Sequence, residues 1–193
     1  MTPEPGAVDL YWIPLGADAH VVKISGAIFE AVAAFVGRRP RVALYHSALQ
    51  IHVPGGRYVV EQAPVVDAHG SDRGVVAEGP VGMRWAGRLR VFRYEVRCWR
   101  GGEIPDLRAA IGSPVRLSGD AAVAQRVLDV VATIPTPVWG RDEMHTGEMW
   151  NSNSVVSWTL TRSGVDLSSV RPPAGGRAPG WHAGAVVAVR EPA

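Results

Sequence analysis

The sequence predicts an α+β fold in which an antiparallel sheet and a separate set of helices make up a single domain, residues 1–193. Two observations lead to this prediction. Several stretches alternate apolar and polar residues, and a Pro-Gly-Gly turn joins two of them as a hairpin. Other stretches place apolar residues at the spacing of an amphipathic helix and carry helix caps.

The first third of the chain contains the predicted hairpin. Residues 8–14 form a short strand that Pro14 ends, and residues 25–37 form a helix that closes at a glycine. Residues 41–53 are the next strand, and residues 57–62 return beside it after the turn.

Loops and regular segments alternate in the rest of the chain. A strand is predicted over 88–100 and helices over 120–132 and from about Ser152 to Arg162, closed by Gly164. Loops are predicted over 66–74, 134–149 and 171–180, before a last apolar segment at 183–189. The loop at 134–149 is long for a compact domain, and such loops often carry function.

Composition excludes several classes of protein. Hydrophobic residues make up 47% of the chain and charged residues 20%, which is enough apolar material for a core. A single cysteine, Cys98, excludes an internal disulfide, and no apolar run reaches the roughly 20 residues that span a bilayer. The N-terminus has no secretory pattern, so we expect a cytoplasmic protein without a membrane span.

The basic residues are nineteen arginines and one lysine, with a formal net charge of only +2. A dedicated nucleic-acid-binding protein has a denser basic surface, so nucleic acid is not the expected partner. A local arginine cluster is either the solvated face of a strand or an anion-binding stripe, and both interpretations stay open. Its members are Arg84, Arg88, Arg90, Arg93, Arg97 and Arg100. No metal-ligand spacing or phosphate-binding glycine pattern is present, so no metal or cofactor is expected.

Two side chains are candidates for chemistry on strands. His46 shares a strand face that starts apolar and ends polar, as at the edge of a cleft, although a half-buried structural histidine would have the same pattern. Cys98 alternates with Phe92, Tyr94 and Val96, so we expect it on a strand, on the apolar face, as a small core residue.

A polar cluster opens the predicted helix after the long loop. Asn151, Ser152, Asn153 and Ser154 follow Trp150, and one helix cap requires only one such residue. The first turn of a helix also has free backbone N–H groups and a positive dipole end, which can stabilise a developing oxyanion.

These segments together resemble the circularly permuted papain-like enzymes, which include PPPDE isopeptidases, relatives of lecithin:retinol acyltransferase and permuted NlpC-type hydrolases. The segment from Tyr45 to Ile51, with the hairpin and the return strand through Glu61, resembles their histidine strand. The run from Asn151 to Asn153 looks like their helix-start motif, with serine in place of the cysteine nucleophile.

The resemblance implies a permuted papain-like architecture and a hydrolase or acyltransferase that acts on an amide, ester or isopeptide bond of a small molecule or peptide. Ser152 would be the nucleophile and His46 the base. Backbone N–H groups beside Asn151 or Asn153 would bind the oxyanion. Because a serine hydroxyl does not ionise as a paired thiol does, a catalytically inactive binding module stays open as the alternative.

The residue that would orient His46 depends on the length of the hairpin turn. A two-residue turn puts Glu61 on the His46 face, and a three-residue turn, which Pro-Gly-Gly slightly favours, puts Gln62 there. His52 lies on the same strand face as His46 and is a third candidate. Ser154 and Trp150 are expected to lie in the cleft beside Ser152.

Overall fold

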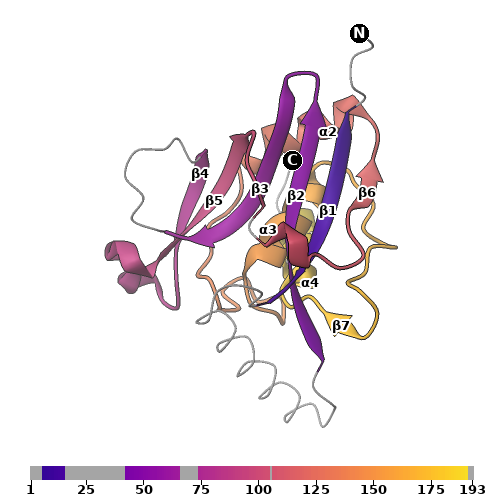
Figure 1. The fold of residues 1–193 in the computed structure, drawn as a ribbon. Coiled ribbons are helices and arrows are strands. Elements are labelled where there is room, and N and C mark those ends of the chain that lie inside the picture. The colour runs from indigo at the N-terminus through magenta and orange to yellow at the C-terminus, as the bar shows by residue number, and fades with distance from the viewer. Residues whose placement is uncertain (1–5, 16–41, 66–73, 105, 191–193) are drawn as a thin grey trace.

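The computed structural model describes residues 6–15, 42–65, 74–104 and 106–190, and the predicted helix at 25–37 lies outside them. Six strands form a sheet in the order β4-β5-β3-β2-β1-β6, and every neighbouring pair is antiparallel (Figure 1). The strands are β1 (Ala7–Pro14), β2 (Ala43–Val53), β3 (Gly56–Pro64), β4 (Val75–Pro80), β5 (Arg93–Arg100) and β6 (Val115–Ser118). A two-residue strand, β7 (Gly176–Arg177), pairs in parallel with the start of β2.

The α-helices that the described residues form are α2 (Ala121–Val131), α3 (Ser152–Arg162) and α4 (Trp181–Arg190). Short 3-10 turns, η1 (Arg84–Arg88), η2 (Arg90–Phe92) and η3 (Leu107–Ala109), interrupt the connections. The helices gather behind the sheet in Figure 1. The predicted α+β class, with an antiparallel sheet and segregated helices, is therefore confirmed. None of these helices is long and apolar enough to cross a bilayer.

The main core lies between the sheet and the helices. Alternate residues of β1 and β2, such as Trp12 and Leu49, pack there against α2 and α3. Helix α3 is buried from Ser152 to Leu160, polar residues included, because it lies between the sheet and α4. A central helix of this kind needs no polar stripe, which explains why its sequence is weakly amphipathic.

A smaller apolar cluster covers part of the opposite face of the sheet. Ile13, Ala48 and Val59 pack there against Ile104, which lies on the segment leading to η3. Both faces of β2 are therefore partly covered, so side chains that point to either face of this strand can be buried.

The hairpin between β2 and β3 has a two-residue turn. Val53 pairs with Gly56, so Pro54 and Gly55 alone form the turn, and the slight preference of the sequence for three residues is wrong. Gly56 has a φ of 131°, a conformation that favours glycine. With this register Glu61 has the strand parity of His46, and Gln62 faces the helices.

The strands β2 and β3 separate after a short paired region. Their ladder ends at Leu49 and Val60, while β3 continues beside β5 as far as Pro64. Figure 1 shows β3 curving away from the lower half of β2. This divergence places Tyr45, His46 and Ser47 on a part of β2 where β3 no longer pairs with it.

The predicted strand at 88–100 is too long at its N-terminal end. Residues 84–92 form the turns η1 and η2, and β5 begins only at Arg93. Phe92 is therefore exposed and does not share a strand face with Cys98. Strands β4 and β6 and the two-residue β7 were not predicted from the sequence pattern.

Candidate functional site

A pocket of about 590 Å³ lies where β2 and β3 separate, and the start of α3 forms part of its wall. His46 lines it from β2, and Asn151, Ser152 and Asn153 line it from the helix start. The remaining described lining residues are Leu15, Leu44, Pro64, Val81, Gly82, Val91, Arg93, Trp139, Gly140, Arg141, Met149 and Pro179. The segment around His46 and the segment from Asn151 to Asn153 are far apart in sequence, and both line this one cavity.

The electrostatic state of His46 follows from its burial. Removal from water disfavours the imidazolium form and lowers the pKa of His46 from 6.5 to about 4. The imidazole is therefore neutral at pH 7 and has a lone pair that can accept a proton.

Helix α3 begins at Ser152, as predicted, with Asn151 as its N-cap. The Asn151 side-chain oxygen accepts from the backbone N–H of Asn153 at 2.9 Å and of Ser154 at 3.4 Å. The Ser154 hydroxyl in return accepts from the Asn151 N–H at 3.1 Å and donates to the Gly180 carbonyl at 2.8 Å. Asn151 and Ser154 therefore form a capping box, and Ser154 has a structural role.

Asn153 joins the helix start directly to the histidine strand. Its Oδ1 accepts from the Ser47 hydroxyl at 2.9 Å, and its Nδ2 donates to the Tyr45 carbonyl at 2.9 Å. The same Nδ2 donates to the Pro179 carbonyl at 2.8 Å. These bonds lie on both sides of His46 in the chain, and they fix the strand relative to the residue beside Ser152. The roles of Ser47 and Pro179 were not predicted from the sequence, because they depend on tertiary contacts.

Ser152 occupies the first helical position and is 9% exposed. Within the part of the chain that the structure describes, no hydrogen bond joins its hydroxyl to His46 or to any other residue. Catalytic hydrogen bonds are often loose without substrate, so this geometry is compatible with a nucleophile.

The donors available to an oxyanion can be counted from these bonds. The cap occupies the N–H groups of Asn153 and Ser154, and the two amide hydrogens of Asn153 go to the carbonyls of Tyr45 and Pro179. Asn151 donates one amide hydrogen to Pro179, which leaves its second. The Ser152 N–H and this second hydrogen of Asn151 are therefore the donors that the helix start offers to a bound carbonyl.

Glu61 and Gln62 are buried on β3 and lie outside the lining of the pocket. Arg97 on β5 contacts Glu61 at 3.7 Å and Glu95 at 2.9 Å. Burial raises the pKa of Glu61 to about 7, against a smaller opposing effect of Arg97. Both polar atoms of the Gln62 amide are buried without a hydrogen-bond partner. Neither side chain forms a hydrogen bond with His46 in the described structure, so neither orients it there.

The other two expected cleft residues lie elsewhere. His52 is 3.9 Å from the Asp9 carboxylate, near the hairpin end of β2. Trp150 is 1% exposed in the main core, where its backbone pairs with Trp139. Trp139 itself lines the pocket and packs edge-on against Tyr94 at 5.8 Å.

Cys98 lies on β5, as expected, and is half-buried at the border of the main core. Burial raises its thiol pKa to about 11, so the thiolate is scarce at neutral pH. It does not line the pocket that His46 and Ser152 share.

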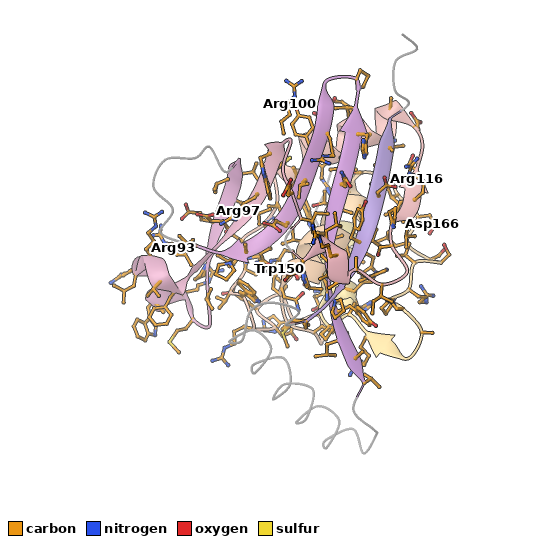
Figure 2. All side chains as sticks on the ribbon, viewed as in Figure 1. Arg93, Arg97, Arg100, Arg116, Trp150 and Asp166 are labelled. Carbon is orange, nitrogen blue, oxygen red and sulfur yellow. The ribbon has the colours of Figure 1, made fainter. Side chains whose placement is uncertain are left out.

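The arginines of the cluster have different environments. Figure 2 shows Arg93, Arg97 and Arg100 spaced along β5, and the first two make ion pairs with Glu78 and with Glu95 respectively. Arg93 also lines the pocket, as does Arg141, whose Nε donates to the Gly82 carbonyl at 2.8 Å. The described lining has no acidic residue, so the pocket favours a ligand that carries a carbonyl or an anionic group next to an apolar part.

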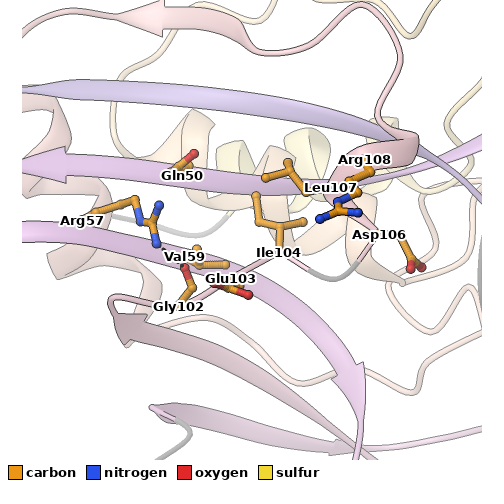
Figure 3. A pocket seen from close by; sticks show the side chains of 9 residues that line it. All are labelled: Gln50, Arg57, Val59, Gly102, Glu103, Ile104, Asp106, Leu107 and Arg108. Carbon is orange, nitrogen blue, oxygen red and sulfur yellow. Dashed lines mark hydrogen bonds between the residues drawn. The ribbon is translucent and has the colours of Figure 1, made fainter.

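A second cavity, of about 610 Å³, lies on the face of the sheet that points away from the helices (Figure 3). Gln50, Arg57 and Val59 line it from the hairpin, with Leu107 and Arg108 from η3. Arg57 donates to the Gly102 carbonyl at 3.2 Å, and the acidic residues of the rim balance the two arginines. The described lining of this cavity has no serine, cysteine or histidine, so the pocket at Ser152 is the stronger candidate for chemistry.

Comparison of the chain with models of known protein families, with curated proteins and with solved structures finds no match.

Proposed function

We propose that this protein is a hydrolase or acyltransferase of amide, ester or isopeptide bonds, built on a permuted papain-like architecture, with Ser152 as nucleophile and His46 as general base. One observation carries the proposal. The histidine of the β2 segment and the serine that begins α3 line the same pocket, and the Ser47–Asn153 hydrogen bond holds their segments together across 106 residues of sequence.

In the proposed reaction the Ser152 hydroxyl attacks the substrate carbonyl while an imidazole nitrogen of His46 accepts its proton. The Ser152 N–H and the second amide hydrogen of Asn151 stabilise the oxyanion. The protonated His46 then gives its proton to the leaving amine or alcohol, and an acyl-serine ester remains. Water or an acceptor nucleophile releases the acyl group, with His46 again accepting and returning a proton.

The low basicity of His46 sets an expectation for the pH profile. With a pKa of about 4 the imidazole is in its base form throughout the neutral range, so activity should be flat from about pH 6 to pH 8 and fall only in acid. A general base this far below neutral is also weak, which predicts a slow reaction unless substrate binding raises its pKa.

The second candidate function is a binding module that uses the same pocket without catalysis. The specific observation in its favour is that, in the described structure, His46 is hydrogen-bonded neither to Ser152 nor to Glu61 or Gln62. The apolar lining and the two arginines would then bind an amphiphilic ligand without turning it over.

A fluorophosphonate probe separates the two functions. We expect the wild-type protein to form a covalent adduct that peptide mass spectrometry locates at Ser152. Ser152→Ala should abolish the adduct, His46→Gln should slow its formation at least about tenfold, and Ser169→Ala, at an exposed serine, should have no effect. If the wild-type protein is not labelled by the probe but does bind apolar ligands that carry a carboxylate, it is a binding module.

A further inference from the structure

In the part of the chain that the structure describes, the large exposed apolar side chains are concentrated in one segment. Of the large hydrophobic residues exposed in the described structure, five fall within residues 83–92, which we call the rim segment. They are Met83, Trp85, Leu89, Val91 and Phe92, and Trp85 and Val91 are 69% and 77% exposed. Scattered exposed apolar residues are ordinary, whereas a contiguous group marks an interaction surface.

The charges of the rim segment have one sign. Arg84, Arg88 and Arg90 alternate with the apolar residues, and the segment contains no acidic residue. Arg84 makes an ion pair with Glu143, which lies in the neighbouring loop. The surface therefore combines an indole, four other large apolar side chains and arginines.

The rim segment is a preformed projection from the sheet. It consists of η1 and η2, and Figure 1 shows this coil extending beyond β4 and β5 at the left of the molecule. Ala86 is buried at its base, and Arg93 donates to the Gly87 carbonyl at 2.6 Å and to Glu78 at 3.1 Å. These contacts fix the backbone while the large apolar side chains point into solvent.

We propose that the rim segment docks this protein onto the surface of an anionic lipid bilayer. Tryptophan and aliphatic side chains partition into the interface between headgroups and acyl chains, and arginines are attracted to anionic headgroups. The segment itself has no acidic residue, and the neighbouring Glu143 is paired with Arg84, so the arginines exceed the carboxylates at this surface.

The position of the rim segment gives the docking a consequence for the pocket. Val91 lines the pocket that contains Ser152, and so do Val81 and Gly82, which precede the segment. A protein docked in this way has that pocket next to the lipid surface. The proposal itself depends only on the rim segment and does not require Ser152 to be catalytic.

Cosedimentation with sucrose-loaded vesicles tests the docking. We expect the full chain to bind vesicles of equimolar phosphatidylglycerol and phosphatidylcholine, and to bind pure phosphatidylcholine vesicles at least about tenfold more weakly. Raising the salt concentration should weaken the binding to the anionic vesicles, because exposed charges are screened.

Two pairs of variants locate the surface. The double variant Trp85→Ser/Val91→Ser should lose at least about tenfold in binding. The matched control Ile111→Ser/Val189→Ser, at exposed positions outside the segment, should bind like the wild type. Arg88→Glu should weaken binding to the anionic vesicles, whereas Arg108→Glu, at an exposed arginine of η3, should not.

Three results would overturn the proposal. The first is wild-type protein that fails to sediment with anionic vesicles. The second is equal loss of binding in the rim variants and in their matched controls. The third is a lipid-independent dimer that the Trp85→Ser/Val91→Ser substitutions dissociate, since it would assign the surface to a second copy of the chain.

Discussion

Acidification should act on His46 and Glu61 in opposite directions, and removing either residue should reveal the effect of the other. Burial lowers the pKa of His46 from 6.5 to about 4. Between these two pH values the unfolded chain therefore binds a proton at His46 and the folded protein does not. Burial raises the pKa of Glu61 to about 7, so the folded protein takes up a proton that the unfolded chain binds only below about pH 4.5. The first effect destabilises the fold as the pH falls, and the second stabilises it.

The two effects are of similar size. The pKa of His46 is displaced from 6.5 to about 4 and that of Glu61 from 4.5 to about 7. At about 1.4 kcal/mol per pH unit and proton, each group changes the free energy of unfolding by about 3 kcal/mol between pH 7 and pH 4. In the wild-type protein these changes nearly cancel.

Urea denaturation at pH 7, 5.5 and 4 measures the balance. Relative to wild type, Glu61→Gln should lose about 3 kcal/mol of stability on going from pH 7 to pH 4, and His46→Gln should gain about the same. The double variant should follow the wild-type profile again. All other carboxylates are common to the four proteins, so their contributions cancel in the comparison.

Parallel pH profiles for the wild type and Glu61→Gln would refute the reasoning for Glu61, since its carboxyl would then be ionised beside Arg97 at neutral pH. Parallel profiles for the wild type and His46→Gln would mean that the imidazole is solvated or paired. A change in the denaturant slope between variants would instead indicate altered unfolded states, which is why that slope must be compared first.

Three further predictions follow from burial and packing. Cys98, with a thiol pKa of about 11, should react with iodoacetamide at pH 7 far more slowly than a free thiol, and rapid labelling would contradict its placement. In Ser152→Cys the new thiol at the helix start should be alkylated well before Cys98 and faster than a free thiol, and an equal rate would argue against a papain-like site. Gly184→Ala should cost about 1–3 kcal/mol in urea denaturation, because its Cβ would overlap the Ser154 carbonyl where α4 crosses α3, while Gly119→Ala, with open space around it, should be nearly neutral.

The elements that sequence reasoning placed well are those with local signals. Asp120 caps α2, Asn151 caps α3, and the hairpin has glycines at its turn. Each signal depends on residues a few positions apart, so no tertiary contact is needed to read it.

The misplaced elements depend on tertiary contacts or imitate another pattern. Strand β4 contains Gly79 and Pro80 and exists because β5 pairs with it. In the rim segment, arginine alternates with apolar residues as in a half-buried strand, although both kinds of residue are exposed there. A period of two was therefore not evidence of a sheet at that position.

The candidate site was predictable only in its outline. The resemblance indicated that His46 and Ser152 should approach each other, and both line one pocket. The ion pair of Glu61 with Arg97 was not predictable, because it depends on β5 lying beside β3. The turn length decides which of Glu61 and Gln62 has the parity of His46, and a Pro-Gly-Gly sequence is compatible with either length.

The bonding of Asn153 makes the integrity of the pocket sensitive to chemical ageing. Loss of ammonia from its side chain would replace a donor by a second carboxylate oxygen, directly opposite the carbonyls of Tyr45 and Pro179. Asparagine is among the thermolabile residues, and Asn153 is protected by burial only while α3 stays folded. A stored or heated sample would then lose the connection between β2 and α3 one molecule at a time, and a mass increase of about one dalton at this residue would report the fraction lost.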